Sequence, residues 1–345
     1  MDMIGVSENT GNMGDNGITG DNGIAGNTGI TGITGETKLL CVIGDPVAHS
    51  LSPRIHNTFA AACGCLGAAG SSGARGDLDS TGHPGTMDDL DVTEGPSRAG
   101  LSYAYLAFPI TQDSLAAFVQ AAKTLNMRGF NVTMPHKEAI VPYIDVMSED
   151  VRCRGVVNTV AIRDGRLHGY NTDGEGFVRA MSRTGFDPKG KTVLILGRGG
   201  AAQTIALSLA ECGMHVCMAA RSRSLPTAVV EARIRGVLWE EIGREACSCD
   251  VLVNATPLGM QGRGEGQRDF DDFSFLEGLP EDAWVVDLIY APRRTQLLAR
   301  AQDRGLRVMN GLAHLVYQAA LAFEIFTGVM PPDGCIEGLL REMCM

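Results

Sequence analysis

From residue 38 onward, hydrophobic positions follow the two spacings that are typical of strands and of helices. Short apolar runs predict buried strands at 39–44, 103–108, 129–133, 156–162, 192–197, 214–220, 251–255, 284–289 and 306–310. Apolar residues three and four apart predict helices at 52–63, 113–125, 174–184, 200–212, 293–303 and 312–326, and a short one from Pro135. This alternation of strands and helices favours an α/β fold built on parallel sheets.

Two segments lack this pattern. From Gly11 to Gly35 every third residue is glycine, but the triplets contain no proline. Without proline the collagen conformation loses its pre-organisation, so we expect residues 1–37 to form a disordered tail, with a short trimerising stub as the alternative. Residues 66–100 are rich in Gly, Ser and Asp and predict a disordered insertion.

The composition indicates a folded, acidic protein. Its 345 residues are enough for two domains, and 44% of them are hydrophobic, which excludes a wholly disordered chain. The net charge of -11 disfavours binding to nucleic acid or to an anionic membrane. No apolar run reaches the ~20 residues of a membrane span and we find no secretory signal, so a cytoplasmic location is expected. The ten cysteines lack metal-binding spacings, which predicts reduced thiols and no metal site.

A glycine-rich loop follows the predicted strand at 192–197 and opens the next helix. Its residues, Gly197-Arg198-Gly199-Gly200-Ala201-Ala202, match a dinucleotide-binding turn, in which glycines let the backbone approach a pyrophosphate. The following strand ends in Arg221-Ser222-Arg223, where an NAD site would place an acid. Guanidinium groups bind phosphate well, so this segment favours NADP. The alternatives are a plain strand–helix turn and arginines that are only solvated surface charge.

Two serines lie in the loop that enters the first helix. Ser52 precedes Pro53, as an N-cap residue commonly does, and Ser50 lies two residues earlier. Capping of the helix explains Ser52 but not Ser50. Two hydroxyls beside a helix N-terminus form a neutral anion site, which suits the carboxylate of a substrate.

Lys137 and Asp173 are the candidate proton carriers. Lys137 lies in the first turn of the short helix from Pro135, where the helix dipole disfavours a cation and should ease its deprotonation. Asp173 begins a later helix, and Asn158 belongs to the strand that precedes that helix. The simpler alternatives are an ordinary surface lysine and an N-cap role for Thr172 or Asp173.

Eight segments occur in the order in which shikimate dehydrogenases have them, and the chain resembles that family. They are GDPVAHSLSP, NVTMPHK, VVNTV, GYNTDGEG, LGRGGAA, NATPLGM, DLIYAP and GLAHLVYQA. The resemblance covers residues 39–330 apart from the insertion. The chain departs from the family pattern in two places: Ala220-Arg221-Ser222 stands where Asn-Arg-Thr is usual, and His314 stands where methionine is frequent.

The resemblance implies two α/β domains with a cleft between them. A substrate-binding catalytic domain would occupy 38–172, a Rossmann-type NADP-binding domain 173–311, and C-terminal helices at 312–345 would return to the first domain. Lys137 and Asp173 would be the acid/base pair. The substrate-binding residues would be Ser50, Ser52 and Thr133 at the carboxylate, Asn158 and Gln318 at ring hydroxyls, and Tyr290 beside the substrate. The cofactor-binding residues would be Gly197, Gly199, Gly200, Ala201, Ala202, Arg221, Ser222, Arg223 and Gly311.

The implied activity is the reversible, NADP-dependent reduction of 3-dehydroshikimate to shikimate in aromatic amino acid biosynthesis, by a monomer or homodimer. One alternative is an NAD-dependent quinate/shikimate dehydrogenase, against which Arg221 argues because it suits the 2′-phosphate of NADP. Another is a non-catalytic protein that senses shikimate or quinate. A sensor transfers no proton, so it would not need both Lys137 and Asp173.

Overall fold

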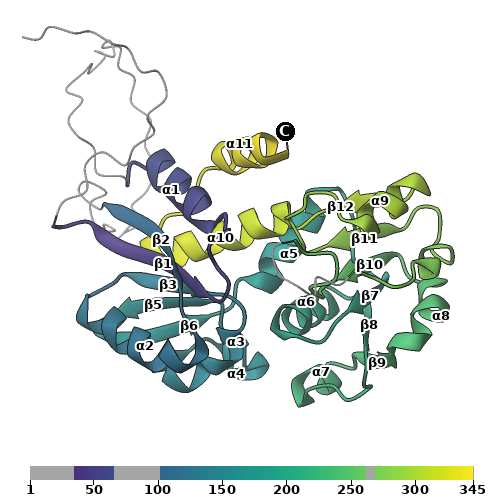
Figure 1. The fold of residues 1–345 in the computed structure, drawn as a ribbon, viewed down its shortest axis with the longest axis horizontal. Helices are drawn as coiled ribbons and strands as arrows, with labels where there is room; N and C mark the ends of the chain where they lie inside the picture. Colours follow the sequence, from purple (N-terminus) through teal and green to yellow (C-terminus); the bar gives the residue numbers. More distant parts are fainter. Residues whose placement is uncertain (1–34, 66–101, 262–268, 345) are drawn as a thin grey trace, which may run out of the picture. The chain divides into compact units, whose positions relative to one another are not determined.

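The computed structural model describes residues 35–65, 102–261 and 269–344 of the chain. The insertion expected at 66–100 lies outside these ranges, and so does the tail expected at 1–37, apart from its last three residues. The described strands form two six-stranded sheets, which confirms the expected α/β class (Figure 1). Within the same ranges, no helix is both long and apolar enough to cross a membrane.

The first sheet is mixed rather than parallel. Its strands are β1 (Lys38–Gly44), β2 (Tyr103–Pro109), β3 (Gly129–Val132), β4 (Val146–Met147), β5 (Thr159–Arg163) and β6 (Arg166–Tyr170), in the order β2-β1-β3-β5-β6-β4. β1 is parallel to β2 and β3, but β5 is antiparallel to β3 and β6. The β5–β6 turn, Asp164-Gly165, has positive φ at both residues, as a type I′ hairpin turn requires. The expectation of a parallel sheet is therefore wrong for this half of the fold.

The second sheet is parallel throughout its described pairs. Its strands are β7 (Thr192–Leu196), β8 (His215–Ala220), β9 (Arg235–Leu238), β10 (Val251–Asn254), β11 (Trp284–Asp287) and β12 (Arg307–Met309). Their order, β12-β11-β10-β7-β8-β9, is that of a Rossmann fold. The order reverses between β7 and β10, and ligands of such sheets bind outside the carboxyl ends of the strands at that point.

Helices connect the strands, and two of the predicted elements begin three residues later than expected. The α-helices are α1 (Ser52–Ala62), α2 (Leu115–Thr124), α3 (His136–Ala139), α4 (Glu149–Arg154), α5 (Asp173–Ser182), α6 (Gly200–Glu211), α7 (Thr227–Glu231), α8 (Ile242–Ala246), α9 (Gln296–Asp303), α10 (Leu312–Thr327) and α11 (Asp333–Cys344). α9 begins later than the expected residue 293, because Thr295 caps it by accepting the N–H of Leu298. The strand expected at 156–162 begins at Thr159.

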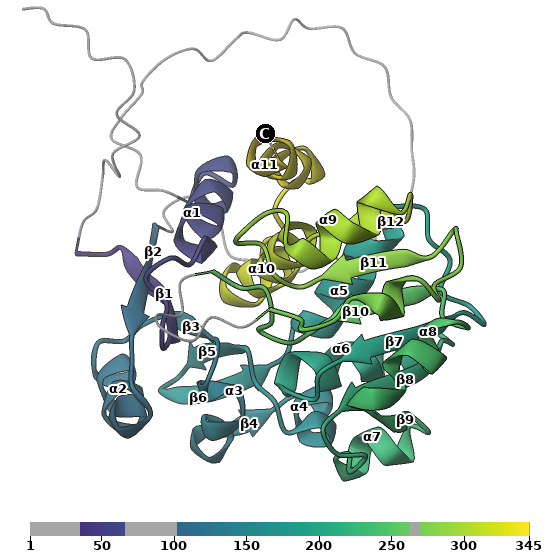
Figure 2. The ribbon, with the colours of Figure 1, turned by 45° about the vertical axis from the view of Figure 1, so that its right-hand side comes forward.

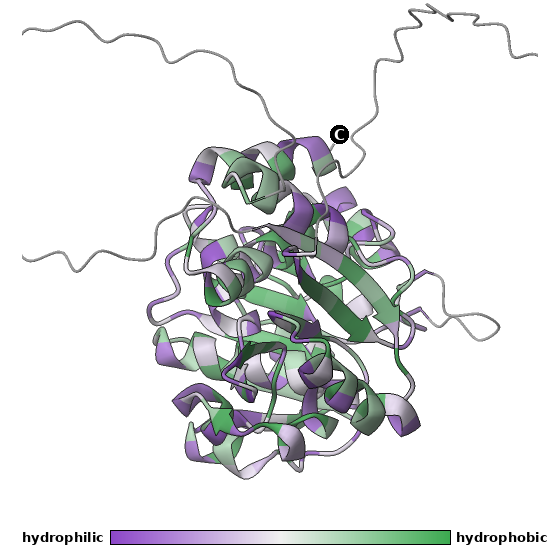
Figure 3. Cartoon of the chain, turned by 90° about the vertical axis from the view of Figure 1, so that its left-hand side faces the viewer, coloured by the Kyte–Doolittle hydropathy of each residue, from purple (hydrophilic) through white to green (hydrophobic). Residues whose placement is uncertain are grey.

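The C-terminal helices share a core with the first sheet. Phe323 and Phe326 of α10 lie in one hydrophobic cluster with Phe59 of α1 and Tyr105 of β2. α10, in yellow, lies beside α1 in Figures 1 and 2. The hydropathy colours of Figure 3 show why the sheets lie inside: strands in view are mainly green, whereas purple residues gather on helices and loops.

Helix α5 packs closely against two other helices because two of its residues are glycines. A Cβ atom added at Gly174 would lie 2.1 Å from Oγ of Ser208 on α6. One added at Gly176 would lie 2.7 Å from Gln318 on α10. Asp173 at the start of α5 is therefore held next to α6, which follows the glycine-rich loop, and next to α10, which packs on the first sheet.

Candidate active site

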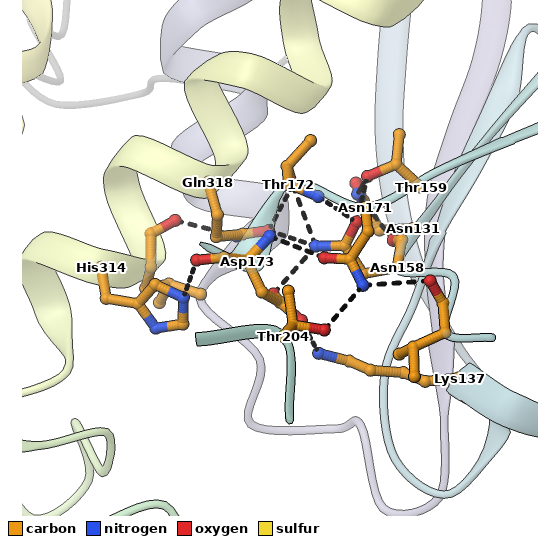
Figure 4. A network of polar contacts seen from close by, with 12 residues as sticks. Asn131, Lys137, Asn158, Thr159, Asn171, Thr172, Asp173, Thr204, His314 and Gln318 are labelled. Atoms are coloured by element: carbon orange, nitrogen blue, oxygen red, sulfur yellow. Dashed lines mark hydrogen bonds and ion pairs between the residues drawn. The ribbon is translucent and has the colours of Figure 1, made fainter. Parts of the chain in front are cut away.

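Lys137 and Asp173 form an ion pair. Lys137 lies in α3, the helix that follows β3 in the chain, and Asp173 is the first residue of α5. Nζ of Lys137 donates to Oδ2 of Asp173 at 2.5 Å, and the Asp173 side chain is only 5% exposed (Figure 4). A buried carboxylate that holds a lysine ammonium is a pair able to move one proton to or from a bound molecule.

Four neighbours fix the position of Asp173. Nδ2 of Asn158 donates to Oδ1 at 2.9 Å, and Oδ1 of Asn171 accepts the backbone N–H of Asp173 at 3.0 Å. Nε2 of His314 lies 3.1 Å from the Asp173 carbonyl oxygen. Burial raises the pKa of the Asp173 carboxyl, but the Lys137 charge and the hydrogen bonds from Lys137 and Asn158 outweigh it, so the pKa is lowered. Asp173 is therefore held as a carboxylate.

The N-cap explanation for the start of α5 is wrong. Lys137 does lie in the first turn of a helix, α3, which has only four residues. Thr172 occupies the N-cap position of α5, but its side chain makes no capping bond. Its hydroxyl instead accepts from Nδ2 of Asn158 at 2.9 Å, while the Asp173 carboxylate faces Lys137 and Asn158. The side chains of Thr172 and Asp173 therefore bond to residues of other elements instead of capping α5.

Gln318 of α10 joins the same network. Its Oε1 accepts from Nδ2 of Asn158 at 3.4 Å and from the hydroxyl of Thr172 at 3.5 Å. The structure therefore brings together Lys137, Asp173, Asn158 and Gln318, which the sequence analysis assigned to catalysis and to ring hydroxyls.

The three candidate carboxylate-binding residues follow two adjacent strands. Ser50 and Ser52 come after β1, and Thr133 comes directly after β3, which is parallel to β1. A Cβ at Gly44, the last residue of β1, would lie 2.4 Å from the Thr133 methyl group. The expected N-cap role of Ser52 is wrong: α1 begins at Ser52 itself, and Oγ of Ser50 accepts the Ser52 backbone N–H at 3.2 Å.

The glycine-rich loop lies at the carboxyl end of β7. Gly197 has φ +114°, which L residues rarely adopt, and Gly199 is the N-cap residue of α6. Gly200 and Ala201 begin α6, and Ala202 is fully buried. Backbone N–H groups at the start of this 12-residue helix are suited to a pyrophosphate.

The arginine segment follows the adjacent parallel strand β8. Arg221, Ser222 and Arg223 are exposed, and Arg223 donates to Glu241 at 2.5 Å. Nη1 of Arg198, in the glycine-rich loop, donates to the Ser224 carbonyl at 3.2 Å and links the two segments. Gly311 follows β12, so all the candidate cofactor residues come after carboxyl ends of the second sheet. Tyr290, a candidate substrate residue, follows β11 of the same sheet.

Sequence reasoning missed several polar residues of this site. Asn131, Thr159, Asn171 and Thr172 belong to the network in Figure 4, but only Thr172 had been considered, and only as an N-cap residue. Arg198 was treated only as the variable position of the glycine loop. The signal was present for Asn131: it is a buried polar residue in an otherwise apolar strand, and such a group needs partners.

Comparisons with known proteins identify relatives over most of the chain. Residues 93–160 match the family model "Shikimate dehydrogenase substrate binding domain", and residues 311–341 match "Shikimate 5'-dehydrogenase C-terminal domain". The shikimate dehydrogenase (NADP(+)) of Moorella thermoacetica is 37% identical over 316 residues, 89% of this chain and 93% of its own.

Solved structures agree with these sequence relatives. A crystal structure of a shikimate dehydrogenase in complex with NADP+ has a TM-score of 0.70 and 30% identity, and the match covers 91% of this chain and 98% of that one. The Thermus thermophilus shikimate 5-dehydrogenase in complex with NADP(H) and shikimate has a TM-score of 0.68 and 30% identity, with 89% and 100% coverage.

Proposed function

This chain belongs to the shikimate dehydrogenase family, and from that premise we propose that it catalyses the NADP-dependent interconversion of 3-dehydroshikimate and shikimate, a step towards aromatic amino acids. The observation that carries the proposal is the 2.5 Å contact between the Lys137 ammonium and the buried Asp173 carboxylate. A protein that only senses its ligand has no use for this proton-transferring pair.

Residues at the carboxyl ends of the second sheet fit NADP. Gly199 has no atom within 4 Å of where a Cβ would lie, so the loop leaves room at the start of α6, and exposed Arg221 follows β8 without an acid beside it in sequence. Gly197, Gly199, Gly200, Ala201, Ala202 and Gly311 would hold the dinucleotide, with Arg221, Ser222 and Arg223 at its 2′-phosphate. When bound, NADP supplies hydride transfer.

The candidate catalytic and substrate-binding residues would supply binding and the proton. During reduction, Lys137 gives a proton to the carbonyl oxygen of the substrate, and during oxidation it takes the proton back. Asp173 holds the ammonium in place, and Asn158 and Gln318 bind ring hydroxyls. The hydroxyls of Ser50, Ser52 and Thr133 bind the substrate carboxylate, and Tyr290 lies beside the ring.

We assign the chain's regions accordingly. Residues 38–172 form the substrate domain, 173–311 the NADP domain, and 312–345 helices that return to the substrate domain; the shared core of α10 with α1 and β2 supports the last assignment. We also propose a cytoplasmic monomer or homodimer. Cys41, Cys217 and Cys249 are buried in the hydrophobic core, as reduced cysteines in proteins of reducing compartments commonly are.

The direct test compares two substrates and two cofactors. Initial rates of reduced-cofactor formation are measured with shikimate and with quinate, each with NADP and with NAD. We expect shikimate with NADP to give the highest kcat/KM. A preference for NAD with quinate would favour a quinate/shikimate dehydrogenase, and tight shikimate binding without turnover would favour a sensor. Either result contradicts the proposal.

Arg221→Ala tests the choice of cofactor. A charge-assisted hydrogen bond to phosphate contributes about 1.5–3 kcal/mol, so the variant should lose roughly ten- to a hundredfold in kcat/KM for NADP. NAD lacks the phosphate and should be used as before. Arg223→Ala is the matched control, because Glu241 already pairs with Arg223, and its effect should be smaller. A double variant that still prefers NADP would contradict the assignment.

A further inference from the structure

A line of buried hydrogen bonds crosses the first sheet and ends at Asp173. The Tyr105 hydroxyl donates to Oδ1 of Asn131 at 2.7 Å, and Nδ2 of Asn131 donates to the Thr159 hydroxyl oxygen at 3.0 Å. The Thr159 hydroxyl donates to Oδ1 of Asn158 at 2.9 Å, and Nδ2 of Asn158 donates to Oδ1 of Asp173 at 2.9 Å. Figure 4 shows the part of this line from Asn131 to Asp173.

Two backbone groups fix the direction of the line. Nδ2 of Asn131 lies 3.2 Å from the Asn158 carbonyl oxygen, which can only accept, so the Asn131 amide cannot be reversed. The Thr172 backbone N–H can only donate, and it donates to Oδ1 of Asn158 at 2.8 Å, which fixes the Asn158 amide. Because both amides are fixed, the hydroxyls of Tyr105 and Thr159 must donate as described.

The sheet and α1 hold the members of the line in place. Asn131 on β3 and Thr159 on β5 are directly opposite one another in the antiparallel pair. Nδ2 of Asn57 on α1 donates to the Tyr105 carbonyl oxygen, and Oδ1 of Asn57 accepts the Tyr105 backbone N–H, at 3.0 Å each. The His56 ring stacks on the Tyr105 ring, with centroids 4.1 Å apart and an interplanar angle of 2°. The phenol therefore has little freedom to turn away from Asn131.

From this geometry we propose that Tyr105, Asn131 and Thr159 are positioning residues for the reaction. Acting through Asn158, they hold its NH2 group towards the Asp173 carboxylate and towards the Thr172 hydroxyl, which in turn donates to Gln318. Successive hydrogen bonds of one direction polarise one another, so each donor strengthens the last bond, the one to the carboxylate. The inference rests on the proposed function, because it assumes that Asp173 acts in catalysis.

The line also contributes to the charge of Asp173. Hydrogen bonds to a carboxylate favour its charged form, so weakening the Asn158 bond should raise the pKa of Asp173. The titratable groups that interact with Asp173 are Lys137 of α3, His314 of α10 and Asp150 of α4. Burial lowers the pKa of His314 and raises that of Asp150, and a substitution at position 159 leaves all three groups in place.

Thr159→Val is the decisive variant, because it removes the hydroxyl and keeps the shape of the side chain. Losing one hydrogen bond of this kind should lower kcat for shikimate oxidation by roughly 3- to 10-fold. The acidic limb of the kcat–pH profile should move to higher pH, and KM for NADP should be unchanged. Thr159→Ser restores the hydroxyl and should restore both the limb and kcat.

Two further variants separate positioning from loss of structure. Tyr105→Phe removes the first donor but keeps the stacked ring, and should shift the limb in the same direction by a smaller amount. Tyr103→Phe, two residues away on the same strand and equally buried, is the matched control and should leave the profile unchanged. Thermal unfolding of each variant shows whether the fold is intact.

The outcomes distinguish this inference from the proposed function. If Thr159→Val is folded and keeps the wild-type pH profile and kcat, the positioning role is wrong. If Thr159→Ser behaves like Thr159→Val, the hydroxyl is not the cause, and the inference also fails. If instead Lys137→Ala retains normal turnover, the assignment of the catalytic pair itself is wrong.

Discussion

Two buried aspartates, Asp173 and Asp287, have pKa values that are shifted in opposite directions. Asp173 lies at the start of α5 and Asp287 at the end of β11, and they are 3% and 0% exposed. Asp287 accepts from Nδ2 of Asn254 at 3.0 Å, from the Ile289 N–H at 3.0 Å and from the Thr295 hydroxyl at 2.7 Å. Burial nevertheless raises its pKa to about 6, whereas the pKa of Asp173 is lowered.

The difference lies in a cation, not in the number of hydrogen bonds. Each carboxylate has an asparagine NH2 group on Oδ1, but only Asp173 has an ammonium group on Oδ2, where Asp287 has a hydroxyl. Neutral donors do not fully offset the loss of hydration, and a charged donor does. Asp287 thus joins β10, β11 and the start of α9, while Asp173 is kept charged beside a proton carrier.

Removing the Lys137 ammonium group should have the largest effect on turnover. Lys137→Ala should leave shikimate binding largely intact and lower kcat by about 10²–10⁴, the usual contribution of a general acid/base. Steady-state kinetics and shikimate titration measure the two quantities separately. Asp173→Asn should also lose turnover, whereas Asp287→Asn, its counterpart in the second sheet, should retain it. A near-normal kcat in Lys137→Ala would contradict the view that Asp173 acts in catalysis whereas Asp287 has only a structural role.

The pH dependence of stability should separate the aspartates next. Because the folded-state pKa of Asp287 is raised, its contribution is fully present below about pH 4 and is lost as the pH rises through about 6. Asp287→Asn lacks this dependence. As the pH rises from about 4 to about 6, the wild type should therefore lose up to about 3 kcal/mol of unfolding free energy that the variant does not lose. Asp173 has the opposite sign: its contribution is lost as the pH falls through its lowered pKa.

Urea unfolding at a series of pH values measures both dependences. If the unfolding free energies of wild type and Asp287→Asn change with pH in the same way, then Asp287 has an ordinary pKa and the prediction is wrong. The comparison with Asp173→Asn is made at the acidic end of the series, where the Asp173 contribution is lost.

Thr295→Val should have the smallest effect. It removes the N-cap bond to the Leu298 N–H and the donor to Asp287, and N-cap losses typically cost about 1 kcal/mol. Because Thr295 touches no part of the Lys137 network, kcat should be unchanged, in contrast to Thr159→Val. If Thr295→Val is stable but has a reduced kcat, then the bonds of Asp287 influence the site around Asp173, and the prediction is wrong.

The sequence predicted the Rossmann half of the fold more fully than the mixed half. Continuous apolar strands and a glycine loop are local signals, and β7, α6 and β8 lie where they were expected. In the first half, Asp164-Gly165 was a hairpin signal that we overlooked, so β6 and the antiparallel pairing were missed. The short β9, α7 and α8 carry too few residues for a periodic pattern.

The candidate site divides in the same way. Lys137, Asp173 and Asn158 were singled out from motifs, and the resemblance added Gln318. Asn131 and Thr159 could not be paired from sequence, because their contact depends on the register between β3 and β5. The N-cap explanation failed for a physical reason as well: at α5, contacts from other elements use the side chains that a helix in isolation would use for capping.

The two glycines of α5 limit how this protein can be recombined with a relative. A chimaera that joins one parent's first sheet to the other's cofactor half has a natural crossover near residue 172. However, Gly174 and Gly176 fit only against the α6 and α10 surfaces around Ser208 and Gln318, at separations where no Cβ is tolerated. A functional exchange must therefore inherit α5, α6 and α10 from one parent, so the unit of exchange is this helix triplet rather than either sheet.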